Sequence, residues 1–308
     1  MAIFVFLLLI DNMTENHRAG FVNIVGNPNV GKSTLMNDLV GERVSIITAK
    51  AQTTRHRIMG IVNTDDYQIV FSDTPGVLSP KYKLQKSMLD FSEGALTDAD
   101  ILLYVTDVVE DPEKNAEFLA KVAKEKIPVL LVINKIDLLK GQDDLIAIVT
   151  RWKERLPNAE IFPTSAKEHF NVKNLMARIV DLLPECPPYF GKDALTDKPA
   201  RFFVTEIIRE KILLNYDKEV PYSVEVIVEK FDESDDAIHI MAVIYVERDS
   251  QKGIIIGRGG SMLKKVGVEA RKDIATFFGK RIYLEMFVKV EPNWRNRENK
   301  LRSFGYME

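Results

Sequence analysis

The chain has 308 residues, of which 46% are hydrophobic and 28% charged, and its formal net charge at pH 7 is −3. This composition is typical of a globular protein long enough for two domains. Cys186 is the only cysteine, which excludes a disulfide framework and agrees with a reducing cytosol.

The most apolar stretch of the sequence is residues 2–10. It is too short to span a bilayer, which needs about 20 residues, and it lacks the basic start and the small-residue cleavage site of a signal peptide. Met13 opens a polar stretch that leads to the first strand. We therefore expect translation to start at Met13, with residues 1–12 as an upstream extension, and we assign residues 1–19 to an N-terminal extension.

A glycine-rich turn joins an apolar strand, residues 21–25, to a helix that begins at Lys32. Its GxxxxGK[ST] spacing is that of a phosphate-binding loop, in which backbone N–H groups and the helix N-terminus point at phosphates. Lys32 is expected to reach the β- and γ-phosphates, and the Ser33 hydroxyl to bind Mg²⁺. The residues predicted to bind nucleotide here are Gly26, Asn27, Pro28, Asn29, Val30, Gly31, Lys32, Ser33 and Thr34.

Residues 51–57 are polar and have no apolar periodicity. They lie where a segment that senses the γ-phosphate is expected, and one of the two threonines, Thr54 rather than Thr53, is predicted to close onto Mg²⁺ in the triphosphate state. The alternative is a basic surface loop.

Asp73 follows the apolar strand 67–71, which delivers its carboxylate to the edge of the sheet where ligands bind. We predict that Asp73 holds Mg²⁺ through a water and that Gly76 offers its N–H to the γ-phosphate. Asp73, Thr74, Pro75 and Gly76 are all predicted nucleotide contacts, and Lys32, Thr54, Asp73 and Gly76 form the predicted catalytic set. Val77 stands where Ras-like GTPases have a water-orienting glutamine, so intrinsic turnover should be slow.

Recognition of the base is predicted after two further strands, 129–133 and 161–162. The carboxylate of Asp137 can accept two hydrogen bonds from the N1–H and 2-amino groups of guanine, a pair that adenine lacks. The N–H of Ala166 is expected to meet guanine O6. The predicted base-binding residues are Asn134, Lys135, Asp137, Ser165, Ala166 and Lys167. Four short segments, which begin at Gly26, Asp73, Asn134 and Thr164, occur in this order along the chain. Together they indicate a guanine-nucleotide site.

Strands and amphipathic helices alternate through residues 20–183, which predicts an α/β P-loop GTPase domain with a mostly parallel, doubly wound sheet. Residues 184–200 contain four prolines and a glycine. We predict that they form a linker between two domains.

In the remaining residues, 201–308, the predicted helices and strands follow a different order. A helix at 205–216 precedes strands at 223–231 and 237–246, and an apolar run at 253–256 precedes a Gly-x-x-Gly turn, a basic helix at 261–278 and a strand at 281–290. This α-β-β-α-α-β order predicts an α+β type II KH domain, which clamps about four nucleotides of single-stranded RNA.

The charge distribution supports an RNA partner. Residues 201–250 carry 6 Lys and Arg against 12 Asp and Glu, whereas residues 251–308 carry 13 against 6. The predicted RNA-binding residues are Ile256, Gly257, Arg258, Gly259, Gly260, Lys264, Lys265, Arg271, Trp294 and Arg295. The alternative for this region is a tight turn before a solvated helix.

Several longer runs closely resemble the Era family of bacterial GTPases. They are GNPNVGKS at 26–33, KAQTTRHRI at 50–58, EIIREK at 206–211, VPYS at 220–223, the stretch from Ile256 to Asp273 and LRSFGY at 301–306. The resemblance covers residues 20–308. One departure is Gly259, where the family often has a lysine, and this change should weaken the phosphate contact slightly.

The resemblance implies a GTP-hydrolysing switch that uses GTP, GDP and Mg²⁺, with K⁺ near Asn29. It also implies that the KH domain binds the 3′ end of 16S rRNA on the 30S subunit precursor, more favourably in the GTP state. We further expect a cytoplasmic monomer with peripheral contact to the inner membrane.

Two alternative functions stay open. A GTPase of tRNA modification or 50S subunit assembly would share Asn29 and the Thr-Thr-Arg run that begins at Thr53. An RNA-binding module with a non-catalytic nucleotide domain is the other alternative, but the intact Lys32, Asp73 and Asp137 argue against it.

Overall fold

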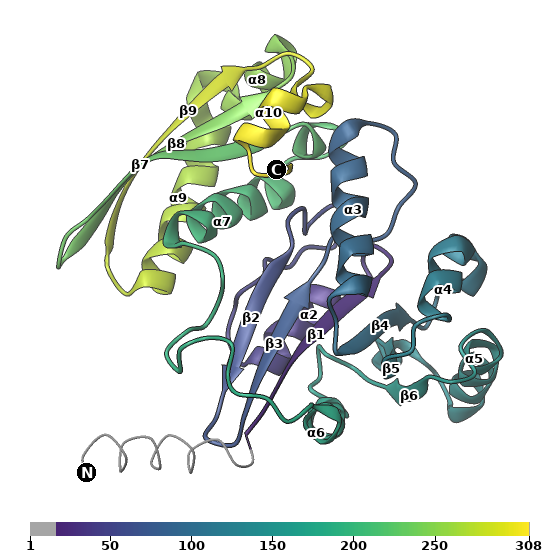
Figure 1. Cartoon of the computed structure of the whole chain (residues 1–308). Helices are drawn as coiled ribbons and strands as arrows, with labels where there is room; N and C mark the ends of the chain where they lie inside the picture. The colour runs from purple at the N-terminus through teal and green to yellow at the C-terminus, as the bar shows by residue number, and fades with distance from the viewer. Residues whose placement is uncertain (1–16, 308) are drawn as a thin grey trace, which may run out of the picture. The chain divides into compact units, whose positions relative to one another are not determined.

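The computed structural model describes residues 17–307 (Figure 1). The chain divides into two compact units, which are described separately. The first unit holds the described residues up to Ser45, together with Thr54–Leu78 and Leu89–Asp197. The second holds Ile46–Thr53, Ser79–Met88 and the described residues from Lys198 onward. The proposed extension at 1–12 and its start at Met13 lie outside the described residues.

The first unit is built on a six-stranded sheet with the order β2-β3-β1-β4-β5-β6. Every neighbouring pair is parallel except β2 and β3, so the prediction of a mostly parallel sheet is confirmed. The strands are β1 (Arg18–Gly26), β2 (Ile58–Asn63), β3 (Tyr67–Asp73), β4 (Ile101–Asp107), β5 (Val129–Asn134) and β6 (Glu160–Pro163). The edge strand β2 was not predicted, because its short apolar run directly follows the polar segment 51–57.

Helices cover this sheet because its strands are apolar on both faces; all seven residues of β4 are buried. Tyr104 of β4 packs against Trp152 of α5, with ring centroids 5.7 Å apart, in a core that also takes residues of α3 and α4. The helices are α2 (Lys32–Val40), α3 (Lys83–Thr97), α4 (Ala116–Val122), α5 (Gln142–Arg155) and α6 (Val172–Leu182), and α3 belongs to this unit only from Leu89 onward.

The predicted linker, 184–200, does not run free between the units. Thr196 bridges to Gly60 of β2, and the side chain of Asn63 donates to Ala194 O at 2.9 Å. Tyr189 packs on Phe21 with ring centroids 4.8 Å apart. The stretch is held along the first unit up to Asp197, because side chains of that unit hydrogen-bond to its backbone.

The second unit contains a three-stranded sheet, β7-β8-β9, in which β7 and β8 are antiparallel and β8 and β9 parallel. The elements follow the predicted α-β-β-α-α-β order. They are α7 (Ala200–Asn215), β7 (Glu225–Glu233), β8 (Ala237–Val246), α8 (Asp249–Ile256), α9 (Ser261–Phe278), β9 (Arg281–Val290) and the short α10 (Glu298–Ser303). The predicted bounds of β8, α9 and β9 agree with the structure, whereas α7 begins at Ala200 rather than at 205.

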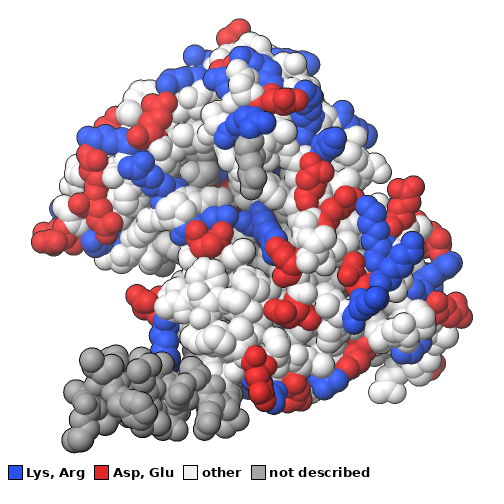
Figure 2. All heavy atoms as spheres, viewed as in Figure 1, with Lys and Arg blue, Asp and Glu red and all other residues white. Residues whose placement is uncertain are grey.

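One core joins α7, α9 and a face of this sheet, with Ile208, Ala270, Ile274 and Ile244 fully buried. In the view of Figure 2, basic side chains are prominent over α8 and α10, with acidic side chains interspersed. Among residues 17–307, no helix is both long and apolar enough to cross a membrane.

Candidate nucleotide and RNA sites

The predicted phosphate loop connects β1 to α2 at the carboxyl edge of the sheet. Gly31 has φ +97°, and a Cβ on Gly76 would lie 2.6 Å from Pro28 Cα, so glycine is required where the loop after β3 approaches the phosphate loop. The Val77 N–H donates to Gly26 O at 3.1 Å. The two loops therefore form one continuous wall in the first unit.

Lys32 is buried at the base of the phosphate loop. Its ammonium donates to Gly26 O at 3.1 Å and to Asn27 O at 2.9 Å. Burial lowers the pKa of Lys32 to about 8, although Asp73 and Glu110 act to raise it. The side chain is thus held in the loop that is expected to receive the phosphates.

This lowered pKa predicts that nucleotide affinity depends on pH. When the pH approaches or exceeds the Lys32 pKa of about 8, part of the free protein has a neutral Lys32. That fraction must take up a proton when phosphates bind, because their negative charge favours the ammonium form. We expect GDP affinity to fall, and proton uptake to grow, as the pH rises from about 7 to about 8.5. Calorimetry in buffers of different ionisation enthalpy measures the uptake. An identical enthalpy in all buffers at the upper pH would contradict the assignment.

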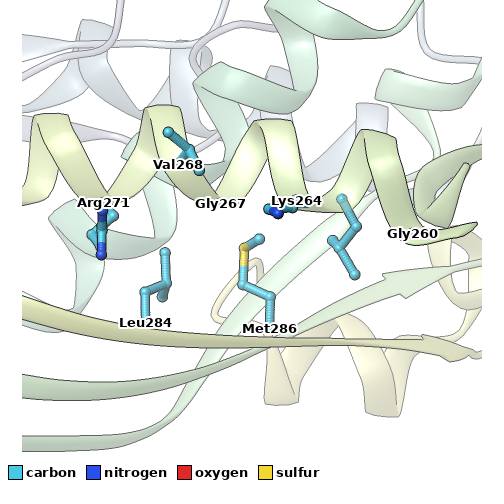
Figure 3. Close-up of a pocket in the computed structure, with 8 residues that line it drawn as sticks. Gly260, Lys264, Gly267, Val268, Arg271, Leu284 and Met286 are labelled. Carbon is cyan, nitrogen blue, oxygen red and sulfur yellow. The ribbon is translucent and has the colours of Figure 1, made fainter.

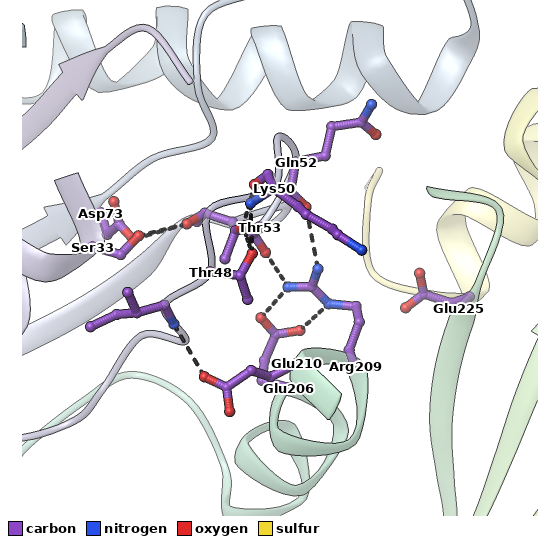
Figure 4. A network of polar contacts seen from close by, with 12 residues as sticks. Ser33, Thr48, Lys50, Gln52, Thr53, Asp73, Glu206, Arg209, Glu210 and Glu225 are labelled. Atoms are coloured by element: carbon purple, nitrogen blue, oxygen red, sulfur yellow. Dashed lines mark hydrogen bonds and ion pairs between the residues drawn. The ribbon is translucent and has the colours of Figure 1, made fainter. Parts of the chain in front are cut away.

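Three side-chain oxygen atoms converge beside this lysine. Ser33 Oγ donates to Asp73 Oδ2 at 2.7 Å, and Thr54 Oγ1 lies 3.1 Å from the same carboxylate oxygen and 2.9 Å from Ser33 Oγ (Figure 4). Asp73 Oδ1 is buried and has no hydrogen-bond partner in the described chain. Burial raises the pKa of Asp73, while Lys32 and the hydroxyls lower it. Hydroxyl and carboxylate oxygens are ligands that Mg²⁺ accepts, so the residues fit the metal.

The neighbouring threonine has a different role. Thr53 Oγ1 bonds to Thr48 Oγ1 and donates to Lys50 O, each at 2.6 Å, within the second unit. The preference for Thr54 over Thr53 as the metal-site threonine is thus supported by the geometry around Asp73.

A buried ion pair on α7 holds the segment Ile46–Thr53 in the second unit (Figure 4). Arg209 Nε donates to Glu206 Oε1 at 2.8 Å, and the guanidinium also donates to the carbonyls of Gln52 and Thr53. Burial opposes its charge, but Glu206 raises the pKa of Arg209. Sequence reasoning missed this anchor; the available signal was the i, i+3 spacing of an acidic and a basic residue, Glu206 and Arg209, on one helix.

The predicted base-binding residues meet at the ends of β5 and β6. The Asn134 amide donates to Val30 O at 2.9 Å and accepts from Ala166 N at 3.0 Å, so Asn134 joins the phosphate loop to the loop after β6. Ser165 Oγ donates to Asp137 Oδ1 at 2.5 Å, and this carboxylate is exposed at the site. Since the Ala166 N–H bonds to Asn134, its contact with guanine O6 stays a prediction.

Other members of the predicted nucleotide set contribute in different ways. Lys135 donates to Asn29 O at 2.5 Å and to Asp107 Oδ2 at 2.7 Å, whereas Lys167 pairs with Glu168 on the surface. The Thr74 hydroxyl donates to Ile24 O at 2.8 Å, inside the protein. Val77 is buried in the core beneath α3, which agrees with the expectation that it cannot orient a water.

In the second unit, a groove of about 540 Å³ lies between α9 and β9 (Figure 3). Its lining residues are Gly260, Leu263, Lys264, Gly267, Val268, Arg271, Leu284 and Met286. Gly260, Lys264 and Arg271 were predicted RNA-binding residues. The apolar members were missed, although their spacing, Leu284 and Met286 on one face of β9, was a usable signal.

The turn at the end of this groove exposes its backbone. Gly257, Gly259 and Gly260 have φ of +73°, +59° and +79°, and a Cβ on Gly259 would meet no atom within 4 Å. Arg258 is exposed, and so is Lys265, which lies 4.0 Å from Glu269. The N–H groups of Gly257 and Gly260 donate within the chain, to Gly253 O at 2.9 Å and to Gly257 O at 3.2 Å. The turn therefore offers open space beside its backbone and the cation of Arg258.

The prediction that Trp294 binds RNA is wrong. Its side chain has 0% exposure, its Nε1 donates to Ser223 O at 2.9 Å, and its ring packs against Phe304. Arg295 pairs with Glu247 and lies over the Tyr82 ring at 4.6 Å, and it does not line the groove. Both residues stabilise the second unit, so the flanking arginines gave a misleading signal.

The first unit, a mostly parallel sheet with a phosphate loop between β1 and α2, is a P-loop GTPase domain, and the second unit is a KH domain. Residues 21–135 match the family described as 50S ribosome-binding GTPase, and residues 219–295 match the KH domain family.

Two solved structures each match more than nine-tenths of this chain. One is Era in complex with MgGDPNP and nucleotides 1506–1542 of 16S ribosomal RNA, with 38% identity and a TM-score of 0.91 over 95% of this chain and 100% of that one. The other is a single-residue variant of Aquifex aeolicus Era bound to GDP.AlF4⁻, with 38% identity and a TM-score of 0.90 over 94% and 100%. The chain belongs to the Era family of GTPases, which confirms the resemblance seen in the sequence.

Proposed function

We propose that the chain is a Mg²⁺-dependent, GTP-hydrolysing switch that binds the 3′ end of 16S rRNA and acts in assembly of the 30S subunit. The observation that carries this proposal is the combination of a complete GTPase site and an open KH groove in one chain. It is supported by 38% identity to an Era structure that contains nucleotides 1506–1542 of 16S rRNA.

In the GTPase site, we assign Lys32 and the phosphate-loop N–H groups to the phosphates, and Asp137 to the guanine. Ser33, Thr54 and Asp73 would hold Mg²⁺, whose charge would stabilise the phosphate oxygens during transfer. Thr54 belongs to the segment that closes in the triphosphate state, and the Gly76 N–H is directed to the γ-phosphate.

In the KH domain, phosphates would lie against the Gly257–Gly260 turn, where the open space at Gly259 and Gly260 lets the RNA approach the backbone closely. Lys264 and Arg271 add the salt-dependent part of the affinity, and the apolar floor formed by Leu284 and Met286 accepts the bases. Gly267 contributes by its size, because a Cβ there would lie 2.9 Å from Met286 Cε and would narrow the groove.

We also propose a K⁺ ion near Asn29, which is exposed on the phosphate loop with φ +67°. Because Val77 offers no help with the water, a cation near the phosphates would supply charge that an arginine finger supplies elsewhere. We expect slow turnover that rises about tenfold in K⁺ relative to Na⁺, and Asn29→Ala should remove the difference. Steady-state hydrolysis in the two salts measures this. Equal parental rates would show that the site does not exist.

The remaining partners are the 30S precursor and, peripherally, the inner membrane, and we propose a cytoplasmic monomer. The second candidate function is a GTPase of 50S assembly or tRNA modification, because residues 21–135 match a family described as 50S ribosome-binding.

Crosslinking the GTP-bound protein to cellular RNA and sequencing the recovered fragments distinguishes these functions. Enrichment of the 16S rRNA 3′ end is expected. Enrichment of 23S rRNA or of tRNA in its place would overturn the proposal.

A further inference from the structure

A buried carboxylate outside all the recognised motifs lies behind the phosphate loop. Glu110, in the turn after β4, is 7% exposed and accepts a hydrogen bond from Thr106 Oγ1 at 2.8 Å. Burial raises the pKa of Glu110, and hydrogen bonds from Thr106 and Asn27 lower it. A glutamate that only kept a surface turn soluble would face water instead.

The partner of Glu110 is a phosphate-loop residue. Asn27 is 2% exposed, and its Oδ1 accepts a hydrogen bond from Asn115 Nδ2, which leaves its Nδ2 as the polar atom available to the Glu110 carboxylate, whose pKa Asn27 lowers. Asn115 thus faces the Oδ1 atom of the Asn27 side-chain amide, and Glu110 faces its Nδ2 atom. The Asn27 side chain has a single orientation in which both of its polar atoms are satisfied.

This network joins the two loops that are expected to surround the γ-phosphate. The backbone carbonyl of Asn27 accepts from Lys32 Nζ at 2.9 Å. Asn115 Nδ2 also donates to Val77 O at 3.2 Å, one residue after Gly76. The negative charge of Glu110 moreover acts to raise the pKa of Lys32.

We propose that Glu110 is a positioning residue of the GTPase site: together with Asn115 it fixes Asn27, and through Asn27 it keeps the phosphate loop in register with the Gly76 loop. This inference rests on the GTPase activity of the family. Because Gly76 is directed to the γ-phosphate, loss of the network should impair hydrolysis more than it impairs GDP binding.

The experiment compares Glu110→Ala, Asn115→Ala, the double variant and Glu110→Gln. A misplacement of reacting groups by about 1 Å can cost up to about 100-fold in rate. We expect each alanine variant to lower kcat about tenfold while GDP affinity stays within about threefold. The double variant should lose little more than either single one, since both remove the same constraint. Glu110→Gln keeps hydrogen-bonding atoms for Thr106 and Asn27 and should restore kcat to within about threefold of the parent.

Glu113→Ala is the matched control, because Glu113 lies three residues further along, in the short helix Pro112–Asn115, but is exposed and pairs with Arg155 on the surface; its kcat should equal that of the parent. Parental hydrolysis by both alanine variants would overturn the proposal. So would equal losses of GDP binding and kcat, or additive losses without rescue by Gln, because either indicates a general structural role. If Glu110→Ala does not fold, Asn115→Ala and Glu110→Gln decide by the same criteria. A parent that hydrolyses no GTP would contradict the GTPase activity itself, which is a separate failure.

Discussion

Replacing Asp137 with asparagine is expected to weaken GTP binding by at least about a thousandfold and to admit xanthosine triphosphate, because a site built around one hydrogen-bond pattern rejects an analogue without it by about 10⁴ to 10⁵. The carboxylate is exposed at the site, and Ser165 Oγ holds one of its oxygens at 2.5 Å. An amide in its place presents a donor toward the two guanine donors. Xanthine carries a carbonyl where guanine has its 2-amino group, so it can accept that donor.

Titration of both nucleotides against the variant and its parent measures the change. Asp143→Asn is the matched control, because Asp143 is exposed in the first turn of α5, away from the loops of the site. The control should bind GTP like the parent. Unchanged GTP affinity in Asp137→Asn would remove Asp137 from the base-binding site.

The second large effect is expected from Arg258→Asp combined with Gly259→Asp, which should abolish binding to single-stranded RNA of the 16S 3′ end. The two carboxylates would stand where the turn is expected to clamp phosphates, and we expect a loss of at least about 100-fold at physiological salt. The turn itself should survive, because aspartate tolerates the left-handed region better than most residues and no atom lies within 4 Å of a Cβ on Gly259.

The control for this variant is Lys230→Asp combined with Ser234→Asp, which changes the net charge equally near the end of β7, the sheet edge opposite the groove. It should retain most of the RNA affinity. GTP binding should survive in both double variants, because the nucleotide-binding loops belong to the first unit. If Arg258→Asp with Gly259→Asp holds this RNA like the parent, the KH groove is not the RNA site, and the basic tail must serve a protein or membrane surface.

The parts of the site that could be predicted from sequence are those in which spacing alone fixes the chemistry. A carboxylate at or shortly after the carboxyl end of a buried strand lies at the ligand edge of the sheet, which predicts the positions of Asp73 and Asp137. The order of elements around the Gly-x-x-Gly turn likewise predicted the KH domain, with α9 and β9 at their observed bounds.

What could not be predicted depends on contacts between residues distant in sequence. Trp294 looks like an RNA-stacking residue among arginines until its indole N–H is seen to donate to Ser223, 71 positions away. Glu206 and Arg209 show only helical spacing, and nothing local indicates that Arg209 holds the backbone just before Thr54. The Asn27 network was missed for the same reason, since Glu110 and Asn115 belong to no motif.

The central claim is that one chain combines a GTP switch with binding of the 16S rRNA 3′ end. The most direct test is the affinity of the full chain for that single-stranded RNA, measured by fluorescence anisotropy at one fixed salt concentration with a non-hydrolysable GTP analogue and with GDP. Coupling between two sites on a protein is typically worth about 5- to 150-fold, and we expect the triphosphate state to bind the RNA at least about tenfold more tightly. Equal affinity in the two nucleotide states would contradict the account.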